Sequence, residues 1–292
     1  MVIPLGAAMD FELFFNQWLL LWQGWSSYTK IVLFFVFWVW MWLPLSVPLA
    51  IAVNWQFPRI PTPQQKLPLI ISLYLLAPLL LWGVSRLENQ PFSSYGLALT
   101  IKTALLTLLG LGISLTGLTL VVALEAHYGW VVWQSDKKQS LLTCLGPLLL
   151  LALLVSTVEE LVFRGFLVNQ LLQIHSPWVA AVWASLLFAL LHGIWDGPSV
   201  APQLPGLWLL GMVLVLARLT NDDNLGLEIG LHGGWVWGLA SLDVSQMLRY
   251  AGHRPPWLIG LGDQPLAGVL GIGLLLATAG VIWASSYFTS SI

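Results

Sequence analysis

The segment Val158-Glu159-Glu160-Leu161-Val162-Phe163-Arg164 places three charged side chains at the end of a long apolar run. Residues 141–158, which lead into it, contain no charged side chain. A charge at the centre of a membrane helix costs roughly 2.5–3.5 kcal/mol, so three together need ionic partners or a wet cavity. The whole chain has only 11 Lys and Arg and 13 Asp and Glu among 292 residues. The segment therefore predicts a functional site within a membrane helix.

The composition predicts an all-α, polytopic integral membrane protein. The chain is 58% hydrophobic and 8% charged, whereas soluble domains carry about 25% charged residues. We expect a single integral membrane domain over residues 1–292, in a cell membrane of bacterial type. The net charge of −2 shows no basic excess, which argues against a nucleic-acid partner. Cys144 is the only cysteine, so a disulfide framework within the chain and a cysteine metal site are excluded.

Hydropathy predicts about eight transmembrane helices, because one crossing needs roughly 20 apolar residues. A Pro-rich linker at 57–65 separates the first two, since repeated prolines prevent a helix there. Residues 11–25 are interrupted by polar side chains and predict an interfacial helix, with a shallow extra span as the alternative. The expected spans are 31–53, 67–84, 104–124, 142–172, 178–195, 206–220, 225–242 and 266–287.

Helical spacing separates the roles of the two glutamates. Glu160 and Arg164 are four residues apart with the acid first, the favourable order for an ion pair on one helix face. Glu159 is rotated by about 100° from Glu160. We therefore expect Arg164 to pair with Glu160. Glu159, in a site of low dielectric, is then the candidate general base.

A second polar group, His192, is expected at the depth of Glu159. The short connection at 175–177 predicts an antiparallel hairpin between the fourth and fifth spans. Glu159 precedes this turn, and His192 follows it, by almost the same number of residues. At about 1.5 Å per residue both lie about 25 Å from the turn, which predicts one shared site.

His232 is the third candidate, in a span with a repeated glycine. Gly226, Gly230, Gly234 and Gly238 recur every fourth residue, a ridge of small residues that allows close approach of another helix. His232 is expected on a different face, about 14 Å from the preceding turn, so it meets the other two only if that turn is recessed or the helices tilt. Glu228 shares the face of His232 and is interpreted as an interfacial acid near the helix start, with a role in orienting His232 or in a metal site as the alternative.

Together these motifs resemble those of the CAAX-protease and bacteriocin-processing (CPBP, or Abi) family of intramembrane endopeptidases. The resemblance covers about residues 140–245, the expected catalytic core, and it implies an eight-helix fold and proteolysis in a membrane-enclosed cavity. By this resemblance Glu159 and His192 activate water, and His232 helps to bind the oxyanion. Glu160 and Arg164 form a structural pair, with Phe188 in the second motif. The matching residues are Glu159, Glu160, Phe163, Arg164, Phe188, His192 and His232.

The sequence departs from the family at Val236, where the last motif usually has Asn or Asp. An oxyanion donor of that kind can contribute about 2.7–4 kcal/mol. The indole N–H of Trp235 is a candidate replacement. Alternatively, the chain has lost its activity.

A metal site remains an open alternative. Glu159, His192 and His232 would hold Zn²⁺ with water in a fourth position, but the chain has no His-Glu-x-x-His pair. Activation of water by Glu159 and His192 without a metal needs only hydrogen-bond reach, and we favour it slightly.

The sequence thus predicts an intramembrane endopeptidase that hydrolyses a prenylated, leader or other membrane-presented peptide. Three rivals remain. An inactive relative would serve as a membrane scaffold, and a proton-coupled transporter would use the same residues as a relay. A lipid-modifying enzyme would be expected to carry more basic residues near the site than Arg164.

Overall fold

The computed structural model describes residues 16–289, and these fall into two compact units. The first unit extends to Ser94 and also takes in Asn169–His175. The second comprises Tyr95–Val168 and continues from Ser176. The candidate residues Glu159, His192 and His232 all belong to the second unit. The prediction of a single membrane domain stays a prediction.

The first unit consists of helices, and hydrogen bonds from tryptophan side chains link two of them. Its helices are residues 16–24, α2 (Ser27–Ala52), α3 (Pro63–Leu87) and most of α6 (Val168–Leu172). Trp38 Nε1 on α2 donates to the Leu73 carbonyl of α3 at 2.9 Å. The predicted linker is non-helical up to Thr62, and α3 begins at Pro63, because proline suits the first position of a helix. Of the predicted interfacial helix 11–25, residues 11–15 lie outside the described residues.

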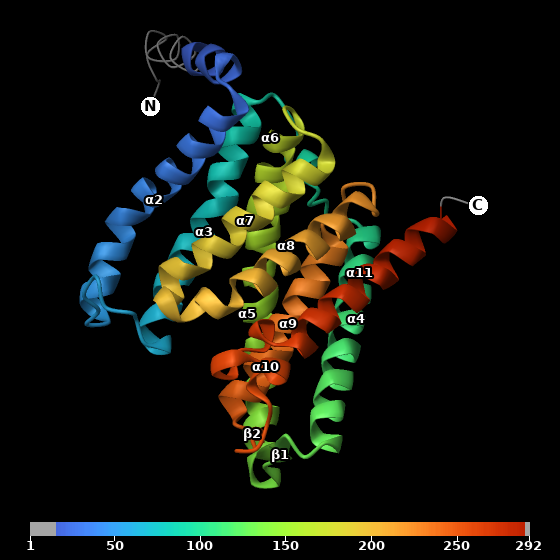
Figure 1. The fold of residues 1–292 in the computed structure, drawn as a ribbon. Helices are drawn as coiled ribbons and strands as arrows, with labels where there is room; N and C mark the ends of the chain where they lie inside the picture. The colour runs from blue at the N-terminus through green and yellow to red at the C-terminus, as the bar shows by residue number, and fades with distance from the viewer. Residues whose placement is uncertain (1–15, 290–292) are drawn as a thin grey trace. The chain divides into compact units, whose positions relative to one another are not determined.

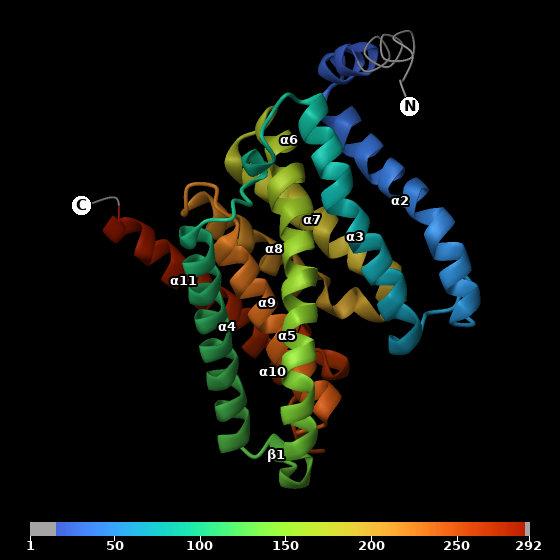
Figure 2. The same ribbon diagram turned by 180° about the vertical axis from the view of Figure 1, so that it is seen from behind.

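The second unit contains the remaining helices and the two short strands of the described chain (Figures 1 and 2). β1 (Val131–Trp133) and β2 (Leu248–Tyr250) pair antiparallel, with Val132 opposite Arg249. The helices are α4 (Ile101–His127), α5 (Lys138–Glu160), α7 (Pro177–Asp196), α8 (Leu204–Leu219), α9 (Gly226–Ser245), α10 (Pro256–Ile259) and α11 (Val269–Thr289). The short helices are η1 (Phe92–Tyr95, begun in the first unit), η2 (Ser135–Lys137), η3 (Leu161–Leu167), η4 (Gly197–Gln203), η5 (Leu261–Asp263) and η6 (Pro265–Ala267).

The all-α prediction is confirmed, and the chain is an integral membrane protein. Among residues 16–289, six helical stretches are long and apolar enough to cross a membrane. One of them, Pro177–Leu219, joins α7 and α8 through η4. α9 is not among the six, because its glycines, Glu228 and His232 make it less apolar. The count of about eight crossings therefore stays a prediction.

α9 packs against α4 along the predicted glycine ridge, and the two helices lie side by side in both views (Figures 1 and 2). A methyl group on Gly226 would meet the Thr103 carbonyl, and one on Gly230 would meet the Thr107 carbonyl. Gly234 likewise faces a side chain of α4, that of Ser114. The backbones approach too closely for any side chain, which confirms the small-residue ridge.

We predict that Gly230→Ala destabilises the protein by about 1–3 kcal/mol, because the added methyl group would overlap rigid backbone of α4. Thermal unfolding in detergent measures the effect. Gly112→Ala on α4 is the matched control, since its methyl group would meet nothing within 4 Å. Equal melting temperatures for the two variants would show that α4 and α9 are not in close contact.

Candidate functional site

The two glutamates stand at a change of helical geometry. α5 ends at Glu160 and continues without a break into η3, a π-helical segment, and then into α6. The three together form the single long stretch Ser135–Leu172, as the predicted fourth span required. π-helical turns are rare and often occur at functional sites. Every residue of η3 is buried.

Arg164 pairs with Glu160, as the helical spacing predicted. Arg164 Nη1 lies 3.1 Å from Glu160 Oε1, and the two side chains are 1% and 0% exposed. Arg164 Nη2 also contacts the Gly211 carbonyl of α8 at 3.4 Å. Its guanidinium lies over the ring of Phe188, 4.4 Å from the centroid, a cation–π contact between η3 and α7. The guanidinium therefore connects three elements of the second unit.

His232 joins the same carboxylate. His232 Nδ1 lies 2.7 Å from Glu160 Oε1, and its Nε2 lies 3.6 Å from Glu159 Oε2. A carboxylate oxygen accepts, so Nδ1–H donates to Glu160. The turn before α9 is recessed: Leu225 and the first turns of α9 are buried, and the Leu225 N–H donates to the Gly96 carbonyl at 3.0 Å. This recess brings His232 to the depth of the glutamates.

Phe188 contacts both histidines and so places His192, the last candidate residue, at the site. Its ring centroid lies 4.6 Å from that of His192 and 5.9 Å from that of His232. His192 Nδ1 is 2.8 Å from the Phe188 carbonyl. A carbonyl can only accept, so Nδ1 carries a hydrogen and Nε2 of the neutral ring keeps its lone pair.

His192 and His232 line one cavity of about 150 Å³, which we call the inner cavity. Trp235 and Val236 also line it, and its other walls are mainly apolar side chains of α4, α8, α9 and α11. The indole N–H of Trp235 is buried and has no hydrogen-bond partner among the described residues. Trp235, the candidate replacement for the family's Asn or Asp, therefore lines the same cavity as both histidines.

The interpretation of Glu228 as an interfacial acid is wrong. Glu228 is fully buried, and neither of its carboxylate oxygens has a hydrogen-bond partner among the described residues. Arg218, at the end of α8, is likewise 1% exposed. Hydropathy does not reveal the burial of Glu228 and Arg218, because each lies near a helix end, where charges ordinarily reach water.

The three candidate zinc ligands do not form a metal site in the described chain. No group of three or more His, Cys, Asp or Glu side chains among residues 16–289 is arranged to hold a metal ion. Both histidines direct Nδ1 at other partners, Glu160 and the Phe188 carbonyl, so only Nε2 of each ring is available as a ligand. The residues present do not fit a three-ligand zinc centre.

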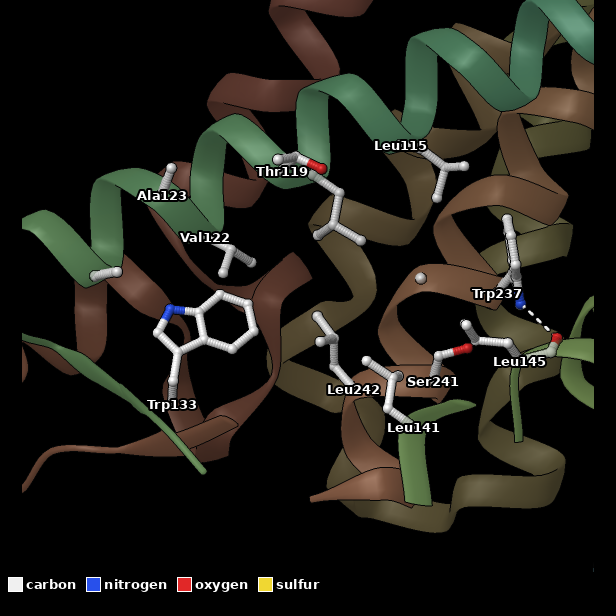
Figure 3. Close-up of a pocket in the computed structure, with 13 residues that line it drawn as sticks. Leu115, Thr119, Val122, Ala123, Trp133, Leu141, Leu145, Trp237, Ser241 and Leu242 are labelled. Carbon is white, nitrogen blue, oxygen red and sulfur yellow. Dashed lines mark hydrogen bonds between the residues drawn. The ribbon is translucent and has the colours of Figure 1, made fainter. Parts of the chain in front are cut away.

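An apolar cavity of about 590 Å³ lies between α4, α5 and α9, with Trp133 of β1 at one end (Figure 3). Thr119, Ala123 and Ser241 are among its lining residues. Trp237 Nε1 donates to the Leu145 carbonyl at 2.9 Å and links α9 to α5 beside it. Sequence periodicity alone did not indicate this cavity.

We predict that Arg164→Met destabilises the protein by about 3–5 kcal/mol, because Glu160 would lose the guanidinium that balances its buried charge. Thermal unfolding in detergent measures the loss.

Lys102→Met is the matched control. Lys102 pairs with Asp222 at 2.7 Å, but the two side chains are 54% and 87% exposed. The hydrogen bond and the charge of Lys102 lower the pKa of Asp222, yet exposed pairs contribute little to stability. If both variants melted alike, the pairing of Arg164 with Glu160 would not support the fold.

Comparison with known families gives one match. Residues 140–238 match the family model described as Rce1-like, type II CAAX prenyl endopeptidase. The matched segment runs from α5 into α9 and contains Glu159, Glu160, Arg164, His192 and His232, which confirms the predicted family resemblance. No curated protein and no solved structure matched the chain.

Proposed function

We propose, on the premise of this match to the type II CAAX prenyl endopeptidases, that the protein hydrolyses a peptide bond in a membrane-presented segment. The observation that carries the proposal is the inner cavity, whose apolar walls are interrupted by Glu125, His192, His232 and Trp235. An apolar pocket with a few convergent polar groups is the usual form of a binding or active site.

His192 is the proposed general base. Its Nδ1–H is held by the Phe188 carbonyl at 2.8 Å, which fixes the ring and leaves the lone pair of Nε2 available. Nε2 takes a proton from water as the water oxygen attacks the carbonyl carbon of the peptide. When the C–N bond breaks, the same proton passes to the leaving amine nitrogen.

Glu159 is the proposed second proton acceptor. It is buried and stands 3.6 Å from Nε2 of His232. A carboxylate held beside the histidines can take up a proton released by water during the reaction.

Trp235 is the proposed oxyanion donor. As water attacks, negative charge develops on the carbonyl oxygen, and a donor fixed in an apolar cavity stabilises it. The indole N–H of Trp235 has no other hydrogen-bond partner among the described residues. His232, which contacts Glu159 and Glu160, also lines this cavity.

The substrate we propose is a peptide that carries an apolar group. The cavity of Figure 3 is lined almost wholly by apolar side chains and shares Leu118, Val122 and Leu242 with a neighbouring cavity. Its volume of about 590 Å³ is within the usual range for ligand pockets, about 300–1,000 Å³. An isoprenyl chain on the peptide would occupy it, and an apolar leader segment is the alternative.

One observation favours an inactive relative instead. Val236 lines the inner cavity where the family usually supplies Asn or Asp. In that case the fold would act as a membrane scaffold, and the protein would cleave no peptide of any composition.

We predict that His192→Ala lowers the rate of peptide cleavage about 10²–10⁴-fold, because it removes the general base. The assay is cleavage of a quenched peptide library, including prenylated peptides, by protein in liposomes. His253→Ala is the matched control, since His253 is exposed in the loop after β2. Equal loss in both variants, or cleavage unaffected by His192→Ala, would contradict the assignment.

We predict that Trp235→Phe lowers kcat by about 10²–10³, because one oxyanion donor is lost while the ring volume is largely kept. KM should change little, since the donor acts in the transition state rather than on bound substrate. Steady-state kinetics on the best library peptide separates the two constants. An unchanged kcat would remove Trp235 from the mechanism.

A further inference from the structure

A second cavity adjoins the inner cavity on the side of β2. It has a volume of about 540 Å³, and we call it the outer cavity. Its lining includes Asp243 and Tyr250, neither of which is buried. Five residues line both cavities and form their common wall: Leu118, Val121, Glu125, Leu239 and Pro265.

Glu125 is the only charged residue of this common wall. It lies near the end of α4 and is 4% exposed. Its side chain forms no hydrogen bond or ion pair with any residue in 16–289. Burial of a carboxylate without a partner is costly, and Glu125 lines both cavities.

The described residues that line the cavities around Glu125 include no Lys or Arg side chain that could form an ion pair with it. The other carboxylate in the outer cavity, Asp243, adds charge of the same sign. Their summed negative field favours a cation that enters from outside the chain.

We propose that Glu125 is a specificity-determining residue that binds a Lys or Arg side chain of the peptide substrate. The proposal rests on the proposed peptidase function, since Glu125 lines the inner cavity together with His192 and His232. Lys and Arg combine a long apolar stem with a charged end. The stem would lie against Leu118, Val121 and Leu239, and the charged end would meet the carboxylate. The preferred substrate is then a cationic membrane peptide, with its basic residue a short distance from the scissile bond.

The first test measures binding without cleavage. Paired fluorescent peptides carry either one lysine or its uncharged analogue norleucine, with the lysine moved through successive positions. Binding is measured by anisotropy in the Glu159→Gln background, with and without Glu125→Gln. We expect one lysine peptide to bind at least about tenfold more tightly than its norleucine partner, the equivalent of one charge-assisted hydrogen bond. Glu125→Gln should abolish that preference.

The second test measures cleavage of the same pairs by the protein with Glu159 intact. The ratio of kcat/KM for the lysine peptide to that for the norleucine peptide should fall to about one in Glu125→Gln. Asp136→Asn is the matched control, because Asp136 is an exposed carboxylate outside both cavities. It should retain the preference.

The outcomes separate the two proposals. If no lysine peptide binds better than its norleucine partner, or if Glu125→Gln weakens both equally, Glu125 has a structural role and the inference fails. If lysine peptides bind through Glu125 but none is cleaved, the peptidase function fails and the cation site stands. Melting temperatures of Glu125→Gln and Asp136→Asn exclude misfolding as the cause of a lost preference.

Discussion

One carboxylate oxygen, Glu160 Oε1, holds the site together. It accepts from Arg164 of η3 at 3.1 Å and from His232 of α9 at 2.7 Å. In water such contacts would contribute little, but here all three side chains are buried, and removal of one partner leaves a charge without compensation. The position of His232, and through Phe188 that of His192, therefore depends on this one acceptor.

The close packing of α4 and α9 is the second constraint. Backbone contact at Gly226 and Gly230 leaves no room for side chains between the helices. This contact fixes the position of α9, the helix that carries the buried side chains of Glu228 and His232. The same two helices line the inner and outer cavities, so the packing that stabilises α9 also shapes the approach to the histidines.

The features that could be predicted from sequence are those set by local spacing. Apolar runs placed the helices, the four-residue spacing gave the pair of Glu160 with Arg164, and the glycine repeat gave the face that meets α4. The depth of His232 could not be settled by counting from a turn, because that count takes the turn to lie at the membrane surface. In the structure Leu225 is instead buried, and its N–H donates to the carbonyl of Gly96, a residue far away in sequence. The burial of Glu228 and the position of Glu125 beside two cavities also depend on contacts between residues distant in sequence. The π-helical turn after Glu160 likewise depends on how that segment packs.

In the proposed reaction, water attacks a peptide carbonyl within this membrane protein. The most direct measurement is mass spectrometry of peptide products formed by the protein in liposomes, in water enriched in the heavy oxygen isotope. We predict one heavy oxygen in the new carboxyl group at an internal bond. That product should be missing with Glu159→Gln at equal protein stability. A folded protein that yields no labelled product from any peptide, or a Glu159→Gln variant that yields as much as the unmodified chain, would contradict the proposal.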